Sequence, residues 1–259
     1  MNDPRKSFFF ILGLIVLMVF SAGLTFKYIE RFASISYFNK ALSAQTVEDA
    51  ENSIAKAIRL NPNDLYFRTA TEIYAIKVNQ LASKGDQLTE NDKVAIQSAF
   101  SFAESSASMA IQYNNSNYLN YQTLGTTYNM AASLGVEGAY DKAVLAFIKA
   151  SELNPSNPGL KLIVARTYLA MGGKIEEAKV YADQALNLKP DYIDALIVLS
   201  QIERALGNRE ASISYAEGAL SLLPGSQELQ AYVNSLRSGN VAPTPVISEE
   251  VESNPDDNQ

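Results

Sequence analysis

Small, aliphatic and polar residues recur in a fixed order along the chain, and the pattern ends at a proline in four of its five copies. The hexamer is ALNLKP at residues 185–190, and its relatives are AIRLNP at 57–62, ASELNP at 150–155, ALSLLP at 219–224 and the weaker AIQYNN at 110–115. Those that begin at residues 150, 185 and 219 are spaced by 35 and then 34 residues. We expect each hexamer to close the second helix of an antiparallel pair. Its alanine lets a facing helix approach closely, the leucine two residues before the proline is buried between repeats, and the proline, which lacks an N–H group, stops the helix.

The first helices of the pairs carry a second pattern. The segment 118–129 places an aromatic residue, a leucine, a glycine and a tyrosine at its positions 4, 7, 8 and 11, namely Tyr121, Leu124, Gly125 and Tyr128. This spacing, with a period of about 34 residues, resembles the tetratricopeptide repeat (TPR), a helix–turn–helix unit. The resemblance implies an all-α fold in which antiparallel helix pairs stack into a right-handed α-solenoid.

Helical periodicity and turn signals predict the remaining elements. We expect helices at 29–43, 47–60, 64–84 and 90–113, and a capping helix at 226–237. The segment TVED at Thr46–Asp49 is typical of a capping box at a helix start. The chain is therefore divided into an N-terminal tail and anchor helix at 1–28, a solenoid of about five helix pairs plus the capping helix at 29–238, and a disordered acidic tail at 239–259.

The N-terminal segment Ser7–Phe26 holds 20 residues without a charge, between Arg5 and Lys6 on one side and Lys27 on the other. A helix of this length spans about 30 Å, the thickness of the hydrocarbon core of a bilayer. We expect a retained single-pass membrane anchor, with the lipid bilayer as its partner. A short basic tail before the span favours an extracytoplasmic repeat domain. The alternative is a signal peptide cleaved after the small residues Ser21, Ala22 and Gly23.

The composition of the chain limits the classes of function that it can have. The chain has no cysteine and no histidine, and its net charge is −7, of which five negative charges lie in residues 241–259. The nearly neutral remainder argues against nucleic acid as a partner. The sequence also lacks a glycine-rich phosphate loop and a metal-spaced acid cluster. We therefore expect a protein that is not an enzyme and that uses no cofactor and no metal.

Binding is expected on the concave wall that the first helices of a TPR solenoid form. The resemblance to this repeat implies that repeat positions 2, 5, 9 and 12 point into the groove. These positions are Gln122, Thr126, Asn129, Leu162, Arg166, Leu169, Asp194, Ile197, Gln201 and Arg204. Arg166 and Arg204 are candidates for binding a peptide carboxylate through two parallel hydrogen bonds.

A further resemblance concerns whole segments. Four segments together resemble the TPR region after the last membrane helix of bacterial O-antigen ligase/polymerase-like proteins. They are ERFASISYFNKAL, AIRLNPND, LNYQTLGTTYNMAASLGVEGAYDKAVLAF and ASELNPSNPGL. This resemblance implies a role in cell-envelope biogenesis. It carries over no catalytic residue, because the sequence has one candidate membrane span and lacks the multi-span catalytic part.

The sequence thus predicts a membrane-anchored TPR scaffold that binds a partner protein or peptide in its concave groove. The alternative is an accessory part of an envelope polysaccharide (O-antigen) ligase or polymerase system, whose partner is a separate multi-span membrane protein that carries the catalytic residues.

Overall fold

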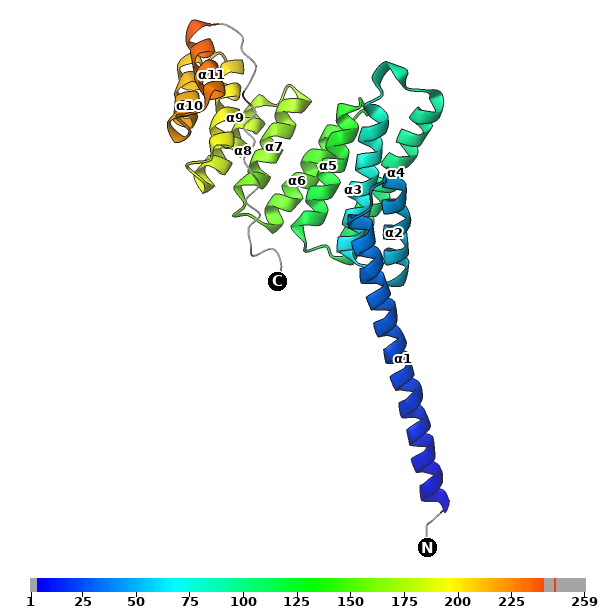
Figure 1. Ribbon diagram of the computed structural model, residues 1–259. Coiled ribbons are helices and arrows are strands. Elements are labelled where there is room, and N and C mark those ends of the chain that lie inside the picture. The colour runs from blue at the N-terminus through cyan, green and yellow to red at the C-terminus, as the bar shows by residue number, and fades with distance from the viewer. Residues whose placement is uncertain (1–3, 240–244, 246–259) are drawn as a thin grey trace. The chain divides into compact units, whose positions relative to one another are not determined.

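A computed structural model describes residues 4–239 and residue 245 of the chain (Figure 1). Within these residues the fold is all-helical, with eleven α-helices, one short 3-10 helix and no strand. The all-α prediction is confirmed. The chain divides into two compact units, Met1–Ala131 and Ala132–Gln259, and each is described by itself.

The first unit is built from helix pairs. Its elements are α1 (Pro4–Leu42), α2 (Val47–Leu60), α3 (Asp64–Ala82), the 3-10 helix η1 (Gly85–Gln87), α4 (Glu90–Tyr113) and most of α5 (Tyr118–Ser133). Helix α1 packs on α2, α2 on α3, and α3 on α4. The predicted bounds of α2 and α4 are confirmed to the residue. Helix α3 ends two residues earlier than predicted, and η1 lies between α3 and α4.

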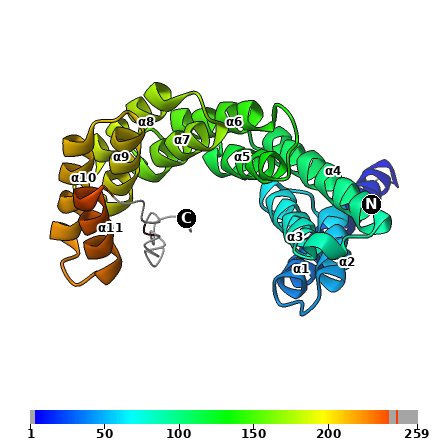
Figure 2. The ribbon, with the colours of Figure 1, turned by 90° about the horizontal axis from the view of Figure 1, so that it is seen from above.

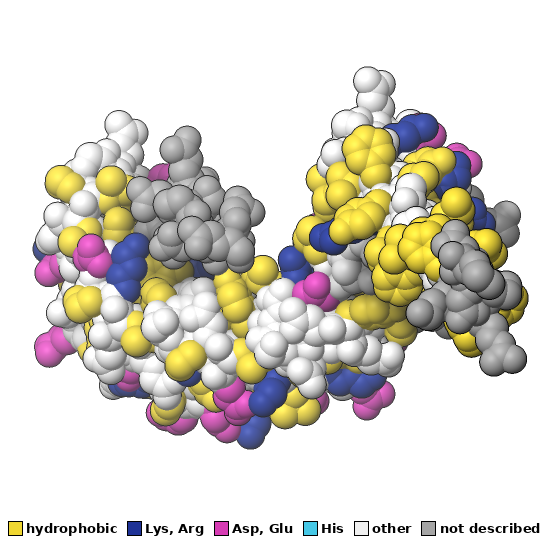
Figure 3. Space-filling view, turned by 90° about the horizontal axis from the view of Figure 1, so that it is seen from below, with side chains coloured by type: hydrophobic (Ala, Val, Ile, Leu, Met, Phe, Trp, Pro, Cys, Tyr) yellow, Lys and Arg dark blue, Asp and Glu magenta, His cyan; other side chains and the backbone are white. Residues whose placement is uncertain are grey.

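Helix α1 is one continuous helix of 39 residues and has no break at residue 28, where the sequence places the end of the anchor. Its C-terminal part packs on α2, where the Ser34 hydroxyl donates to the carbonyl oxygen of Ala57 at 3.0 Å. Its N-terminal part, from Phe8 to Phe26, is exposed. Figure 3 looks at the molecule from the side on which α1 projects and shows hydrophobic side chains gathered there. By length and composition alone this is the one helix among the described residues that could cross a membrane.

The second unit continues the alternation of helices. Its elements are α6 (Ala139–Leu153), α7 (Pro158–Met171), α8 (Ile175–Leu188), α9 (Ile193–Ala205), α10 (Arg209–Leu222) and α11 (Gln227–Ser238). Each helix packs on the next in chain order, and Figure 2 shows α8 to α11 following one another. The core between α7, α8 and α9 joins leucine and valine side chains, such as Leu162, Val198 and Leu199, to a row of buried alanines.

The recurring hexamers occupy equivalent places. Their first residues, Ala57, Ala110, Ala150, Ala185 and Ala219, are all 0% exposed. In each hexamer the carbonyl oxygen of this alanine accepts the backbone N–H of the residue four positions later, which is the C-cap of the helix. The four helices that precede a proline end two residues before it. This is the expected effect of proline on the residue before it. The prediction that the hexamers close the second helices is confirmed.

One detail of the hexamer prediction is wrong. The leucine two residues before the proline is exposed in α8 and α10, at Leu188 and Leu222, and partly buried at Leu60 and Leu153. These leucines lie in the last turn of their helices. The alanine three residues earlier holds the fully buried position instead.

Helix α11 covers the end of the last pair, as the sequence predicts. Its residues Tyr232, Val233 and Leu236 pack on the buried Ala216 of α10. Arg209 fixes the far end of α11, because its Nε donates to the carbonyl oxygen of Leu236 at 3.1 Å. The predicted disordered acidic tail lies outside the described residues, apart from Gly239 and Pro245.

The predicted cap at Thr46 is present in part. The Thr46 hydroxyl oxygen accepts the backbone N–H of Asp49 at 3.1 Å, and the Thr46 hydroxyl itself donates to the Asp49 carboxylate. The reciprocal capping box occurs at the start of α4 instead. There the Asp92 carboxylate accepts the backbone N–H of Thr89 at 3.0 Å, and the backbone N–H of Asp92 donates to the Thr89 hydroxyl oxygen at 3.1 Å.

The α4 capping box is expected to be sensitive to acid. A hydrogen bond from Lys84, followed by hydrogen bonds from Thr89, lowers the pKa of Asp92 from 3.8 to about 2. A carboxyl group whose pKa is lower in the folded state stabilises that state above pH 3.8, and the contribution is lost as the pH falls towards about 2. Asp92→Asn is therefore expected to lower the melting temperature at neutral pH and to leave the melting temperature unchanged near a pH of about 2. A difference that persists unchanged in acid would contradict this assignment.

Candidate functional site

A cavity of about 300 Å³ lies between α3 and α5 in the first unit. Its lining includes Arg68, Glu72 and Asn79 from α3, and Leu119, Gln122 and Thr126 from α5. These positions recur at helical spacing, so one face of each helix supplies one wall. Most of the lining residues carry a polar group, but most of the lining surface is apolar.

A second hollow of about 580 Å³ adjoins the other side of α3. Its lining residues come from the end of α1, the start of α2 and α3, and include the aliphatic side chains of Leu42, Val47, Ile73 and Ile76. Glu72 lines both cavities. Helix α3 therefore presents the Glu72 carboxylate between the two hollows.

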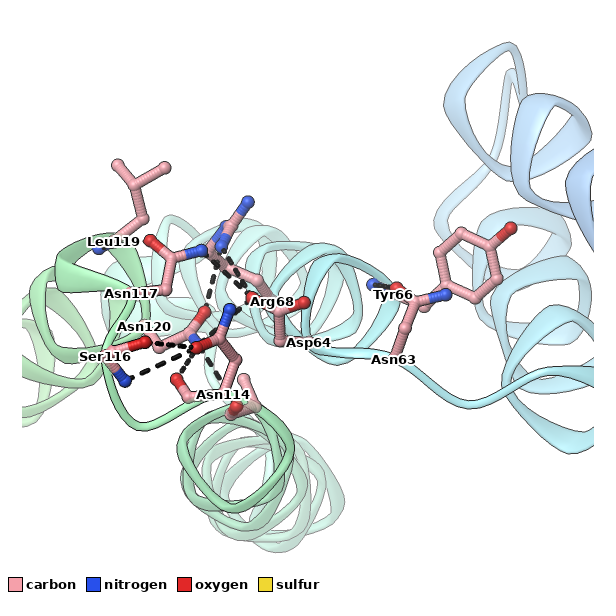
Figure 4. A network of polar contacts seen from close by, with 10 residues as sticks. Asn63, Asp64, Tyr66, Arg68, Asn114, Ser116, Asn117, Leu119 and Asn120 are labelled. Carbon is pink, nitrogen blue, oxygen red and sulfur yellow. Dashed lines mark hydrogen bonds and ion pairs between the residues drawn. The ribbon is translucent and has the colours of Figure 1, made fainter. Parts of the chain in front are cut away.

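A buried polar network fixes the geometry of the α3–α5 cavity (Figure 4). Asn120, which is 0% exposed, donates from Nδ2 to the carbonyl oxygens of Ala110 at 3.0 Å and Asn114 at 2.8 Å. Its Oδ1 accepts a hydrogen bond from Nη1 of Arg68 at 2.9 Å. Asn120 thus joins the end of α4 and the start of α5 to a side chain of α3.

Asp64 completes the network from the first turn of α3. Its Oδ2 accepts hydrogen bonds from Nδ2 of Asn117 at 2.9 Å and Nδ2 of Asn120 at 3.3 Å, and it lies 3.8 Å from Nη1 of Arg68. Arg68 is therefore charge-compensated within the protein. Buried polar groups that are fully paired in this way hold their elements rigidly.

Glu72 differs from Arg68 in having no such partner. Glu72 is exposed on α3, and partial burial of its carboxyl group raises its pKa, while the positive charge of Arg68 lowers it. Among residues 4–239, the structure gives the Glu72 carboxylate no hydrogen bond. A carboxylate in this position can accept hydrogen bonds from a cation that enters the cavity.

The amide groups of Asn79 and Gln122 are also available. Within the described part of the chain, neither side chain forms a hydrogen bond. The nearby hydroxyl of Thr126 donates to the backbone carbonyl oxygen of Gln122 at 3.0 Å and keeps its acceptor capacity. A primary amide both donates and accepts, which matches the N–H and C=O groups of a peptide backbone.

The predicted groove residues of α5 are placed differently from one another. Gln122 and Thr126 line the α3–α5 cavity. Asn129 is half-buried, is not one of the residues that line this cavity, and its Oδ1 is enclosed without a hydrogen-bond partner among the described residues.

Two of the predicted groove residues in the second unit are core residues, and their assignment to a surface is wrong. Leu162 is 1% exposed and packs among the α7–α9 alanines, and Ile197 is 2% exposed and packs with Leu196, Ala219 and Leu229. Both are aliphatic side chains, whose burial is more favourable than contact with water. A partner cannot reach them without unfolding the unit.

Arg166 and Asp194, both predicted groove residues, pair with each other. Nη2 of Arg166 on α7 lies 2.7 Å from Oδ1 of Asp194 on α9. The arginine fork expected to bind a partner's carboxylate therefore already has a carboxylate partner. A ligand at Arg166 would have to compete with Asp194 for part of that fork.

The other predicted residues of the second unit remain at or near the surface. Arg204 is exposed on α9, Gln201 is half-buried on the same helix, and Leu169 is half-buried against the α7–α9 core. Among the described residues, no side chain forms a hydrogen bond or an ion pair with the Arg204 guanidinium. Their role in binding stays a prediction.

The sequence pattern missed the α3 wall of the cavity. The hexamers at 57 and 110 are 53 residues apart rather than one repeat, so groove positions could not be counted off along α3. The signal that identifies this wall is the spacing of Arg68, Glu72, Ala75 and Asn79 by four, three and four residues. This spacing places all four on one helix face. Among the described residues there is no cluster of three or more acidic side chains that could hold a metal ion.

The sequence matches no protein-family model and none of the curated proteins. Solved structures, however, resemble the fold. A crystal structure of MamA protein has a TM-score of 0.55 at 16% identity and covers 82% of this chain and 98% of that chain. YrrB, a TPR protein with an unusual peptide-binding site, has a TM-score of 0.54 at 18% identity and covers 78% and 92%. A tetratricopeptide repeat protein from Parabacteroides merdae has a TM-score of 0.58 at 17% identity and covers 80% and 74%.

These similarities show that the chain has a TPR fold. At identities of this size they show the fold alone. The predicted TPR architecture is therefore confirmed at the level of stacked helix pairs.

Proposed function

We propose that the protein is a scaffold that binds a segment of a partner protein along α3 and α5 and is held at a membrane by the N-terminal part of α1. The observation that carries the binding proposal is the α3–α5 cavity, where Glu72, Asn79 and Gln122 present polar groups without internal hydrogen bonds. YrrB, which has the same fold, is a TPR protein with a peptide-binding site, in keeping with a peptide as the ligand.

The charges at this cavity favour a basic segment of the partner. Arg68 is hydrogen-bonded to Asn120, lies 3.8 Å from Asp64 and also lowers the pKa of Glu72, so one positive charge faces two carboxylates and a negative charge is left in excess. A lysine or arginine of the partner would neutralise it, and the amides of Asn79 and Gln122 would bind the backbone on either side. The rigid network beneath the cavity keeps the reorganisation needed for binding small.

Membrane anchoring is supported by the exposed apolar surface of α1 from Phe8 to Phe26. An exposed surface of this kind is unfavourable in water and favourable in a bilayer. The anchor would hold the repeat domain at the membrane surface, and we place that domain on the extracytoplasmic side. A role in the cell envelope, including an accessory role beside a multi-span O-antigen ligase or polymerase, depends on the sequence resemblance alone. Co-purification with such a membrane protein would favour it.

Peptide selection tests the binding proposal. Peptides selected on the full-length protein from a random displayed library are expected to contain lysine or arginine. Glu72→Gln is expected to weaken their binding about ten-fold, because a charge-assisted hydrogen bond is lost. Binding to the unaltered protein should also weaken in acid as Glu72 takes up a proton, and this loss begins at a higher pH than the usual glutamate pKa of 4.5 because the pKa is raised.

The matched control is Glu90→Gln, which removes the same charge from an exposed position at the start of α4. Affinity should be unchanged in this variant. Selected peptides that lack a basic residue would contradict the proposed site. So would peptides that bind Glu72→Gln and Gln122→Ala as tightly as they bind the unaltered protein.

A further inference from the structure

The face of α1 that points away from α2 carries large apolar side chains beyond the predicted membrane span. Tyr28 is 70% exposed, Phe32 is 76% exposed and Ile35 is 44% exposed. The opposite face of the same helix is buried, with Ser34 bonded to α2 and Ala41 in the core. The first helix of the solenoid thus presents an uncovered apolar face, whereas terminal repeats normally present a polar outer face.

The exposed residues have the spacing of a coiled-coil seam. Tyr28, Phe32, Ile35, Asn39 and Leu42 are separated by four, three, four and three residues. This alternation is a heptad repeat in which Phe32 and Asn39 occupy a positions and the other three occupy d positions. An apolar period of 3.5 residues generates a seam along which parallel helices wind in a left-handed supercoil.

The same register continues without a break into the predicted membrane span. Counting back from Tyr28, the seam positions are Thr25, Ser21, Met18, Leu14 and Ile11. The hydroxyl groups of Thr25 and Ser21 donate to backbone carbonyl oxygens of their own helix, at 2.9 and 3.1 Å. The small side chains at these two positions allow a second helix to approach closely within a bilayer.

A bilayer surface cannot cover the part of this face that lies farthest from the predicted membrane span. At 1.5 Å per residue, Ile35 lies about 13 Å and Asn39 about 20 Å beyond Phe26, the last residue of the uncharged segment. The headgroup region on one side of a bilayer is only about 5 to 8 Å thick. Tyr28 can lie among headgroups, but Ile35, Asn39 and Leu42 extend past them into water.

We propose that this face binds α1 of a second copy of the same chain, in a parallel and in-register coiled coil that runs from the bilayer into the first helix pair. The proposal rests on the membrane anchor of the proposed function. Two copies inserted with the same topology are necessarily parallel, and a two-fold dimer brings the same surface of both copies together. A partner of different sequence would need the same register by coincidence.

Asn39 supports a second copy in particular. An asparagine at a single a position can bond with the same asparagine of a parallel partner, and this pairing fixes register and oligomeric state at some cost in stability. In the present structure the Asn39 side chain is exposed, and no hydrogen bond of this side chain is found within residues 4–239. The same position in an antiparallel pair, or opposite an unrelated helix, would leave the amide facing apolar groups.

Disulfide crosslinking tests the dimer directly, because the chain contains no cysteine and every crosslink reports an introduced position. The full chain is reconstituted in phosphatidylcholine vesicles as single variants Phe32→Cys, Ile35→Cys or Asn39→Cys and oxidised with copper phenanthroline. A disulfide needs Cα atoms within about 7 Å, which a and d positions of a parallel pair provide. The controls Ala33→Cys and Lys40→Cys lie on the same helix but off the seam.

The expected result is a dimer band in the three seam variants and almost none in the two controls. Adding Phe32→Glu to Ile35→Cys should abolish that band, since it places two charges against each other in the seam. Equal crosslinking at seam and control positions, or none at either, would overturn the dimer. Extraction of the same vesicles with carbonate separates the two proposals: protein retained in the bilayer without seam crosslinks overturns the dimer alone, whereas release of the protein overturns the anchor.

Discussion

Asn120→Asp is expected to destabilise the first unit by about 3 to 4 kcal/mol, although it changes one side-chain atom. In the native protein Nδ2 of Asn120 donates to the carbonyl oxygens of Ala110 and Asn114 and to the Asp64 carboxylate. A carboxylate in its place would face three acceptors without a proton to share. The fully buried site offers no water to relieve the repulsion.

Hydrogen exchange of α3 and α5 peptides measures this effect in the full-length protein. The control is Asn115→Asp, an exposed position in the same turn, for which the change is expected to stay within about 0.5 kcal/mol. If Asn120→Asp exchanged at the rate of the unaltered protein, the network could not be what holds the wall of the cavity.

Ala185→Leu is expected to destabilise the second unit by about 2 to 3 kcal/mol. Ala185 is 0% exposed and packs against residues of α7 and α9, so the added atoms have no empty volume to enter. A dense core responds by shifting side chains from their preferred rotamers or by moving helices apart. Hydrogen exchange checks this prediction, and the expected result is faster exchange in the α8 and α9 peptides of the variant.

Asn187→Leu provides the matched control for this prediction. It adds a leucine to the same helix two residues later, at an exposed position. Stability should change by no more than about 0.5 kcal/mol. Equal effects of the two leucines would mean that the recurring alanines do not mark the close contacts between helices.

The sequence predicted most of the fold because its strongest signals are local. A proline two residues after the ends of α2, α6, α8 and α10, and in these helices and α4 an alanine whose carbonyl oxygen accepts the C-cap N–H, act within one turn of helix and depend little on the rest of the chain. For the same reason the bounds of α2 and α4 could be predicted to the residue. The continuity of α1 could not, because an apolar membrane segment and an amphipathic repeat helix can follow each other without any break in helical propensity.

The candidate site was harder to predict because it depends on distant residues. Arg166 and Asp194 are 28 positions apart, and only the packing of α7 beside α9 shows that they pair. Leu162 and Ile197 were assigned to the groove by repeat position, but their aliphatic side chains take the buried side of their helices. Glu72 was missed because the longer spacing around α3 hid its place in the repeat.

The central claim is that α1 is a retained membrane helix continuous with the first repeat helix, so that the binding face is held close to the bilayer. The most direct measurement is the intact mass of the protein in carbonate-washed membranes from cells that produce it. We predict a membrane-retained chain that still contains residues 1–26. A chain that begins near Gly23 or Leu24 and is recovered in the soluble fraction would contradict the claim.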